Sequence, residues 1–97
     1  MYANGWGVPQ DFAEAVKWYR LAANQGTAKA QAILGAMYAD GQGVPQDYVQ
    51  AHMWLNLAAA QGLEGAGKAR DDIAGIMTPS QIEEAQRLAR EWLAAHP

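Results

Sequence analysis

The sequence predicts an all-α fold built from repeated pairs of helices. Three observations support this prediction: a segment that recurs after 36 residues, apolar residues at helical spacing within the copies, and an alanine-rich composition without cysteine. Of the 97 residues, 51% are hydrophobic and only 18% are charged. A chain of this length forms a single domain, and alanine is the residue that most favours helices.

The internal repeat becomes visible when residues 1–26 are placed over residues 37–62, because 16 of the 26 positions are then identical. The best-matched part, Gly-x-Gly-Val-Pro-Gln-Asp, begins at Gly5 and again at Gly41. A period of about 20–50 residues is typical of solenoid proteins. We therefore divide the single domain into a truncated first repeat (1–26), a second repeat (27–62) and a degenerate capping helix pair (63–97).

The first helix of the second repeat is expected from about Ala28 to Ala39. Its apolar residues recur every three or four positions, as on one face of an α-helix. Thr27 is suited to cap the start, and Gly41 to end the helix in the left-handed conformation that other residues avoid. The residues expected to face inward are Ala30, Ile33, Leu34, Met37 and Tyr38.

The second helices of the two repeats are expected over Asp11–Gln25 and Asp47–Gln61. The aspartate that opens each segment can accept hydrogen bonds from the free N–H groups of the first turn. Trp18 and Trp54 recur in the apolar stripe of these helices, so we expect both to pack in the core. The glycine-rich turn before Asp47 is interpreted as a structural elbow that sets the angle between paired helices.

The C-terminal part is expected to close the array. Leu63–Ile76 occupies the place of a third first helix, but its apolar pattern has decayed. Thr78, Pro79 and Gln81 form a strong start for a last helix, in which we expect Glu83 to pair with Arg87. The residues expected to face inward from it are Ile82, Ala85, Leu88, Ala89, Trp92 and Leu93.

These patterns together resemble the Sel-one-like repeat, a helix-turn-helix relative of the tetratricopeptide repeat. The resemblance covers nearly the whole chain, and the C-terminal segment is similar to the ends of bacterial proteins of that family. The matching residues run Leu34-Gly35-x-x-Tyr38-x-x-Gly41-x-Gly43-Val44-x-x-Asp47-Tyr48-x-x-Ala51-x-x-Trp54-x-x-x-Ala58-Ala59-x-Gln61-Gly62.

The resemblance implies a right-handed α-solenoid with a tetratricopeptide-like superhelix and a C-terminal capping helix. It also implies a non-catalytic scaffold or adaptor that binds a protein or peptide partner in the concave groove of its stacked helix pairs. The alternative is a small β-lactam-related hydrolase or ligand-binding protein. That branch of the family depends on a disulfide in each repeat, and this chain has no cysteine.

Composition and residue inventory argue against several other functions. A formal net charge of −3 gives no electrostatic reason to bind nucleic acid, and no apolar run is long enough for membrane insertion. The hydroxyl nucleophiles are limited to Ser80, Thr27 and Thr78, while His52 and His96 form no metal-binding pattern. We therefore predict a soluble protein that is not an enzyme and needs no cofactor. The sequence leaves its compartment undetermined: cytoplasmic, or periplasmic if a leader was removed.

Two surfaces are candidates for contact with partners. By analogy with tetratricopeptide repeats, the outward positions of the first helices would line the partner-binding groove. These positions are Lys29, Ala32, Ala36, Ala39, Asp40, Lys68 and Asp72. The second surface is the N-terminal end, where part of a first helix is absent and self-association or helix exchange could follow. Its residues are Tyr2, Trp6, Phe12, Val16 and Tyr19.

Overall fold

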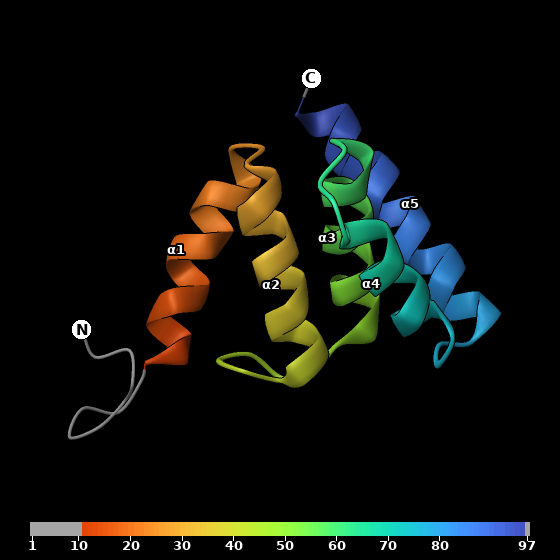
Figure 1. Ribbon diagram of the computed structural model, residues 1–97, viewed down its shortest axis with the longest axis horizontal. Helices are drawn as coiled ribbons and strands as arrows, with labels where there is room; N and C mark the ends of the chain where they lie inside the picture. Colours follow the sequence, from red (N-terminus) through yellow and green to blue (C-terminus); the bar gives the residue numbers. More distant parts are fainter. Residues whose placement is uncertain (1–10, 97) are drawn as a thin grey trace.

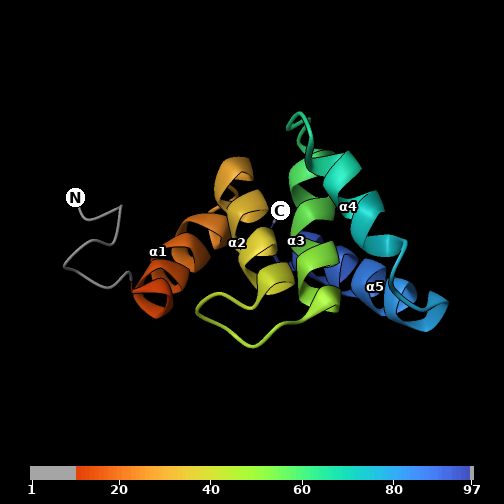
Figure 2. The ribbon, with the colours of Figure 1, turned by 60° about the horizontal axis from the view of Figure 1, so that its bottom comes forward.

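A computed structural model describes residues 11–96, and this part of the chain contains five helices and no strand. The helices are α1 (Phe12–Asn24), α2 (Ala28–Asp40), α3 (Tyr48–Ala60), α4 (Ala66–Ala74) and α5 (Pro79–Ala95). Figures 1 and 2 show α1 at one end of the array and α4 with α5 at the other. The predicted all-α solenoid is confirmed.

Helix α3 is the centre of the packing, because it contacts α2, α4 and α5, whereas α1 packs against α2. Its side chains are accordingly among the most buried in the protein. Met53, Trp54, Leu55 and Leu57 are all nearly inaccessible to solvent. Burial of one such side chain contributes about 1.5–3 kcal/mol, so α3 provides much of the hydrophobic stabilisation.

Most helix ends follow the expected capping chemistry. The Asp11 carboxylate accepts a hydrogen bond from the Glu14 N–H at 2.9 Å, and Asp47 accepts one from the Gln50 N–H at 3.1 Å. Gly41 ends α2 with φ of 72°. Thr27 occupies the N-cap position of α2, but its side chain makes no capping hydrogen bond. The prediction was therefore right about this boundary and wrong about the role of the hydroxyl.

The elbow between α2 and α3 (41–47) is tied to the helix that precedes it. The Asp47 N–H donates to the Tyr38 carbonyl at 2.9 Å, and the Gln46 side-chain amide donates to the Ala39 carbonyl at 2.9 Å. Val44 packs against the core, as expected of an elbow that is part of the fold. Figures 1 and 2 show that this segment reaches toward the start of α1.

The C-terminal pair differs from expectation in two details. Helix α4 is shorter than predicted, because Gly65, with φ of 86°, lies immediately before it and Gly75 follows it. Helix α5 begins with the predicted capping box of Thr78 and Gln81. The predicted pairing of Arg87 with Glu83 is wrong, since Arg87 instead bridges Glu84 at 2.8 Å and Glu91 at 2.5 Å.

The two repeated tryptophans have different environments, which corrects the expectation that both pack in the core. Trp54 is 3% exposed and meets Trp92 of α5 edge-on, with ring centroids 6.1 Å apart. Trp18 is 64% exposed. The physical reason is that α5 packs extensively against α3, whereas no comparable helix among residues 11–96 covers Trp18 on α1. Leu93, expected inside, is also half exposed.

Candidate protein-binding surfaces

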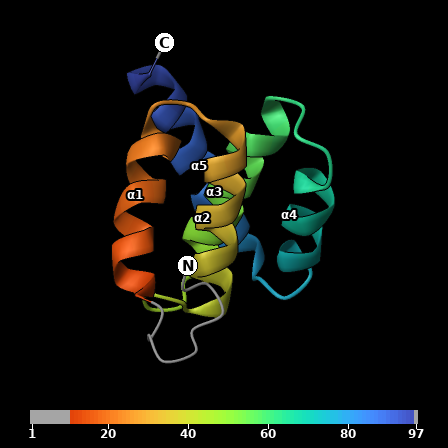
Figure 3. The same ribbon diagram turned by 60° about the vertical axis from the view of Figure 1, so that its left-hand side comes forward.

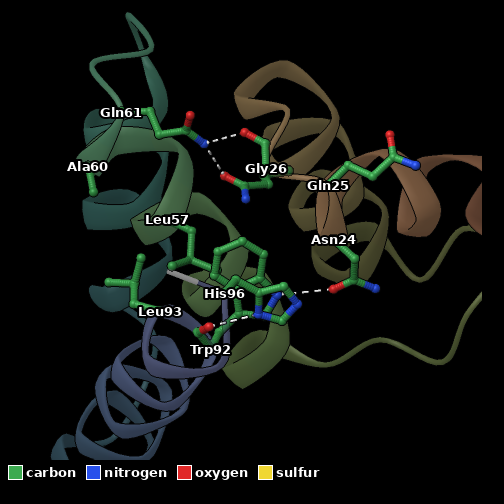
Figure 4. A pocket seen from close by; sticks show the side chains of 10 residues that line it. Asn24, Gln25, Gly26, Leu57, Ala60, Gln61, Trp92, Leu93 and His96 are labelled. Carbon is green, nitrogen blue, oxygen red and sulfur yellow. Dashed lines mark hydrogen bonds between the residues drawn. The ribbon is translucent and has the colours of Figure 1, made fainter.

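A pocket of about 530 Å³ lies where the α1–α2 turn meets the C-terminal ends of α3 and α5 (Figure 4). Figure 3 shows the end of α5 beside that turn. Three segments that are far apart in sequence therefore build one cavity. The lining residues are Asn24, Gln25, Gly26, Gln31, Leu57, Ala60, Gln61, Trp92, Leu93 and His96.

One wall of the pocket is an amide network. The fully buried Gln31 donates from Nε2 to the Ala23 carbonyl at 3.1 Å. Its Oε1 accepts from Gln61 Nε2 at 2.9 Å, and the same nitrogen donates to the Gly26 carbonyl at 2.8 Å. The two bonds donated by Gln61, drawn in Figure 4, tie the end of α3 to the α1–α2 turn and to α2. The bond to the Ala23 carbonyl and the bond from Gln61 together satisfy both polar ends of the Gln31 side chain. A buried amide left without these partners would carry a desolvation cost of about 1–3 kcal/mol.

The opposite wall is aromatic. The Trp92 indole N–H donates to Asn24 Oδ1 at 3.0 Å, which joins α5 to the end of α1. His96 stacks on the same indole with centroids 4.0 Å apart and planes 9° from parallel. One face of Trp92 thus stacks on His96, and Trp54 packs against the same indole in a T-shaped arrangement. The indole contributes an ordered wall, with its rotation restrained from three sides.

The pocket chemistry is that of a neutral site. Among the described residues, no Asp, Glu, Lys or Arg lines it, while the amides of Asn24, Gln25 and Gln61 offer donors and acceptors next to the apolar side chains of Leu57 and Leu93. Such a lining suits a ligand that presents both an apolar group and amide-like hydrogen-bonding groups. This pocket was not predicted from the sequence. The available signal was the glutamine before the last glycine of each repeat, which recurs as Gln25 and Gln61.

A second hollow, of about 400 Å³, lies between α1 and α2. We call it the α1–α2 groove. It brings together Tyr19, predicted for self-association, and Lys29, predicted for partner binding. Its remaining lining is mostly apolar. The complete set is Trp18, Tyr19, Ala22, Thr27, Lys29, Ala30 and Ile33.

Comparison with known proteins identifies the repeated unit. The Sel1 repeat family matches residues 1–27 and 28–63, more than half of the chain. The chain belongs to the Sel1 repeat family. Repeats of this family are generally protein–protein interaction modules. Among curated proteins, none matches the chain.

A solved structure with a Sel1-like repeat (SLR) fold is similar over almost the whole chain. It is a protective antigen present in uropathogenic Escherichia coli strains, and it aligns with a TM-score of 0.85 at 34% sequence identity. The alignment covers 96% of this chain and 20% of that one. The chain therefore spans about one fifth of the length of the similar protein.

The residues predicted for the partner-binding groove of this Sel1 repeat lie on α2 and α4, which both pack against α3. Lys29, Ala36 and Asp40 are exposed, whereas Ala32 and Ala39 are half-buried. On α4, Lys68 and Asp72 are exposed and form an ion pair at 3.2 Å. None of these residues lines the pocket of Figure 4. Their role in binding stays a prediction.

The residues predicted for self-association divide into three groups. Tyr2 and Trp6 lie outside the described residues. Phe12 is 38% exposed and Tyr19 is half-buried. Val16 is only 4% exposed and belongs to the core cluster, so the expectation that it contributes to an open surface is wrong. It lies on the α2 side of α1, at the repeat position that His52 occupies in α3.

Two further features bear on function. Across residues 11–96, no three His, Cys, Asp or Glu side chains gather in a way that could hold a metal ion. Over the same residues, no helix combines the length and apolarity needed to cross a membrane.

Proposed function

We propose that this Sel1 repeat chain is a non-catalytic adaptor that holds a peptide segment of a partner protein. The observation that carries the proposal is the neutral pocket of Figure 4, in which amide side chains lie beside apolar ones. Gln61 Nε2 and Asn24 Oδ1 already bond within the protein. The Gln61 carbonyl oxygen, the Asn24 amino group and the Gln25 amide can pair with the N–H and C=O groups of a peptide backbone. Leu57 and Leu93 can then pack against one apolar side chain of that peptide.

The size and composition of the pocket support a peptide over a charged ligand. A volume of about 530 Å³ is large enough for a few side chains. Because no Asp, Glu, Lys or Arg among residues 11–96 lines the cavity, a charged ligand would lose hydration without gaining an ion pair with such a side chain. His96 already stacks on the Trp92 indole, so an incoming group meets packed walls.

The outward face of α2 and α4 is the second part of the proposal. Its alanines, Ala32, Ala36 and Ala39, leave room for a partner between the charges of Lys29, Asp40, Lys68 and Asp72. Contacts of this kind fix orientation and association rate more than affinity. We therefore assign affinity to the pocket and specificity to this face.

The proposal is tested by selecting binders from a phage-displayed library of uncharged peptides and following the Trp92 indole N–H resonance during titration. Selected peptides should shift that resonance, and Leu93→Asp should weaken binding at least tenfold. Ile76→Asp is the matched control, because Ile76 is also an exposed apolar residue (64%) but lies outside the pocket. Peptides that bind without shifting the Trp92 resonance, or that bind the Leu93→Asp variant equally well, would refute the pocket as the binding site.

The rival hydrolase function requires a nucleophile beside a base. Ser80 and His96 lie at opposite ends of α5, about 24 Å apart at 1.5 Å per residue. His52 is buried in α3. A screen with β-lactam and peptide substrates separates the two functions, since robust turnover abolished by Ser80→Ala or by substitution of His52 would overturn the adaptor proposal.

A further inference from the structure

The imidazole of His96 lies on the indole of Trp92 in the pocket of Figure 4, and few contacts keep it there. The two residues are one helical turn apart, so their side chains share one side of the chain. Their ring centroids are 4.0 Å apart. Among residues 11–96, the imidazole makes one hydrogen bond, from Nδ1 to the Trp92 carbonyl at 2.8 Å. Both contacts of the imidazole are therefore with a single residue.

The position of His96 in the helix makes this stack easy to open. His96 is the C-cap of α5, one residue beyond Ala95, and it is exposed. Its backbone N–H donates to the Leu93 carbonyl at 3.3 Å. Contacts at the ends of helices open at a low free-energy cost, because few other groups must move with them. The imidazole can thus leave the indole without disturbing the core.

The indole of Trp92 is held in place by contacts that do not involve His96. Its N–H donates to Asn24 Oδ1 at 3.0 Å, and Trp54 packs against it with ring centroids 6.1 Å apart. Trp92 is also half-buried against the core cluster. When the imidazole leaves, the face that it covered therefore remains as a flat apolar platform. A platform that needs no reordering lowers the cost of binding.

We propose that this face of Trp92 takes an aromatic side chain of the bound peptide, and that His96 is an internal competitor which that side chain displaces. The inference rests on the proposed function, because it names the side chain that the peptide places in the pocket. A phenyl or phenol ring has the planar shape of the imidazole and buries more apolar surface on the indole. Internal competition lowers the apparent affinity in proportion to the fraction of molecules in which the face is free.

The choice of side chain is tested with two phage-displayed libraries of uncharged peptides. One library contains phenylalanine, tyrosine and tryptophan, and the other has leucine and methionine in their place. We expect peptides from the first library to shift the Trp92 indole N–H resonance, and peptides from the second to bind at least tenfold more weakly. In a selected peptide, cyclohexylalanine at the aromatic position should weaken binding about fivefold, because it has a similar volume without a flat ring.

Displacement of the imidazole is tested with variants of His96. His96→Ala should strengthen binding of the aromatic peptide about fivefold, because the competitor is gone. His96→Trp should weaken it about threefold or more, because a larger ring covers the same face. Ile76→Ala, at an exposed site outside the pocket, should leave the affinity unchanged. A role of His96 in folding alone would not produce opposite effects of the two His96 variants.

The C–H resonances of the His96 imidazole give an independent readout. In the free protein, the ring current of the Trp92 indole should shift them upfield, because the two rings are stacked. Binding of the aromatic peptide should return them toward the values of an unstacked histidine.

The possible failures of the inference and of the proposed function differ. Equal affinity of aromatic and aromatic-free peptides would overturn the inference and leave the peptide pocket in place. Unchanged His96 resonances in the complex, or a His96→Ala variant that binds the aromatic peptide no more tightly, would do the same. If neither library yields a peptide that shifts the Trp92 resonance, the proposed function is refuted and the inference with it.

Discussion

Gly43, in the elbow between α2 and α3, lies directly against the backbone of Phe12 at the start of α1. A β-carbon on Gly43 would come within 2.5 Å of the Phe12 carbonyl carbon and 2.9 Å of its Cβ. The backbone of Gly43 also has φ of 77°, in the region that other residues adopt at a cost. The elbow thus holds the first helix of the described chain against the second repeat.

Replacing Gly43 by alanine should therefore destabilise the protein for two reasons. The left-handed conformation costs about 1–2 kcal/mol, and displacement of the Phe12 backbone adds a packing cost of about 1–3 kcal/mol. Gly26→Ala is the matched control, because Gly26 also has positive φ but nothing within 4 Å of its added β-carbon. Urea denaturation should show a larger loss for Gly43→Ala, and equal losses would contradict the close approach. Gln42→Ala should have little effect.

The repeated tryptophans should respond very differently to truncation. Trp54→Ala removes a fully packed indole and its edge-on contact with Trp92, so the free energy of unfolding should fall by about 3–5 kcal/mol. Trp18→Ala removes a side chain that is 64% exposed and should change stability by about 0.5 kcal/mol or less. Thermal or urea unfolding measures both. A large loss for Trp18→Ala would mean that α1 is covered in solution.

Thr27 and Thr78, at the N-caps of α2 and α5, allow a similar comparison of two substitutions. Thr78 Oγ1 accepts from the Gln81 N–H at 3.1 Å, and the Gln81 side chain accepts from the Thr78 N–H at 2.9 Å. Thr78→Ala should therefore cost about 1 kcal/mol. Thr27→Ala should cost less, because the Thr27 side chain makes no capping hydrogen bond. Chemical denaturation that ranks the two variants in the opposite order would contradict the assigned caps.

Local features of the fold were predictable from the sequence because their causes are local. Glycines with positive φ, aspartates at N-caps and apolar residues at helical spacing act within a few residues. The observed boundaries of α2, α3 and the start of α5 accordingly lie within one or two residues of the predicted ones. Helix α4 was less accurate, because the glycines that shorten it, Gly65 and Gly75, lie inside the segment that repeat alignment assigned to a helix.

Burial and the pocket were not predictable in the same way. Trp18 and Trp54 have the same local sequence signal, and only the position of α5 makes one exposed and the other buried. Val16 was assigned to an open face, yet it packs toward α2. The pocket combines Asn24, Gln61 and Trp92, and no periodicity within a repeat connects residues so distant in sequence.

His52 combines burial with an unpartnered polar atom. It is 3% exposed, and among the described residues its Nδ1 has no hydrogen-bond partner. Burial lowers the pKa of His52 below its ordinary value of 6.5, and the nearby Arg70 lowers this pKa further, while Asp71 opposes the shift. The neutral imidazole is therefore favoured in the folded protein relative to the unfolded chain.

This shift predicts that stability falls in mild acid. Above pH 6.5, His52 is mostly neutral in both the folded and the unfolded state, so it gives the free energy of unfolding no pH dependence. As the pH drops below 6.5, the unfolded chain binds the proton before the folded protein does. Stability then decreases by up to about 1.4 kcal/mol per pH unit until the pH passes the lowered pKa. His52→Val, which places the residue of the first repeat here, should remove this loss between about pH 5 and 7. His96→Gln, at an exposed site, should retain the loss. Urea midpoints measured across that pH range test both variants. A His52→Val variant that kept the wild-type slope would contradict the assignment to His52.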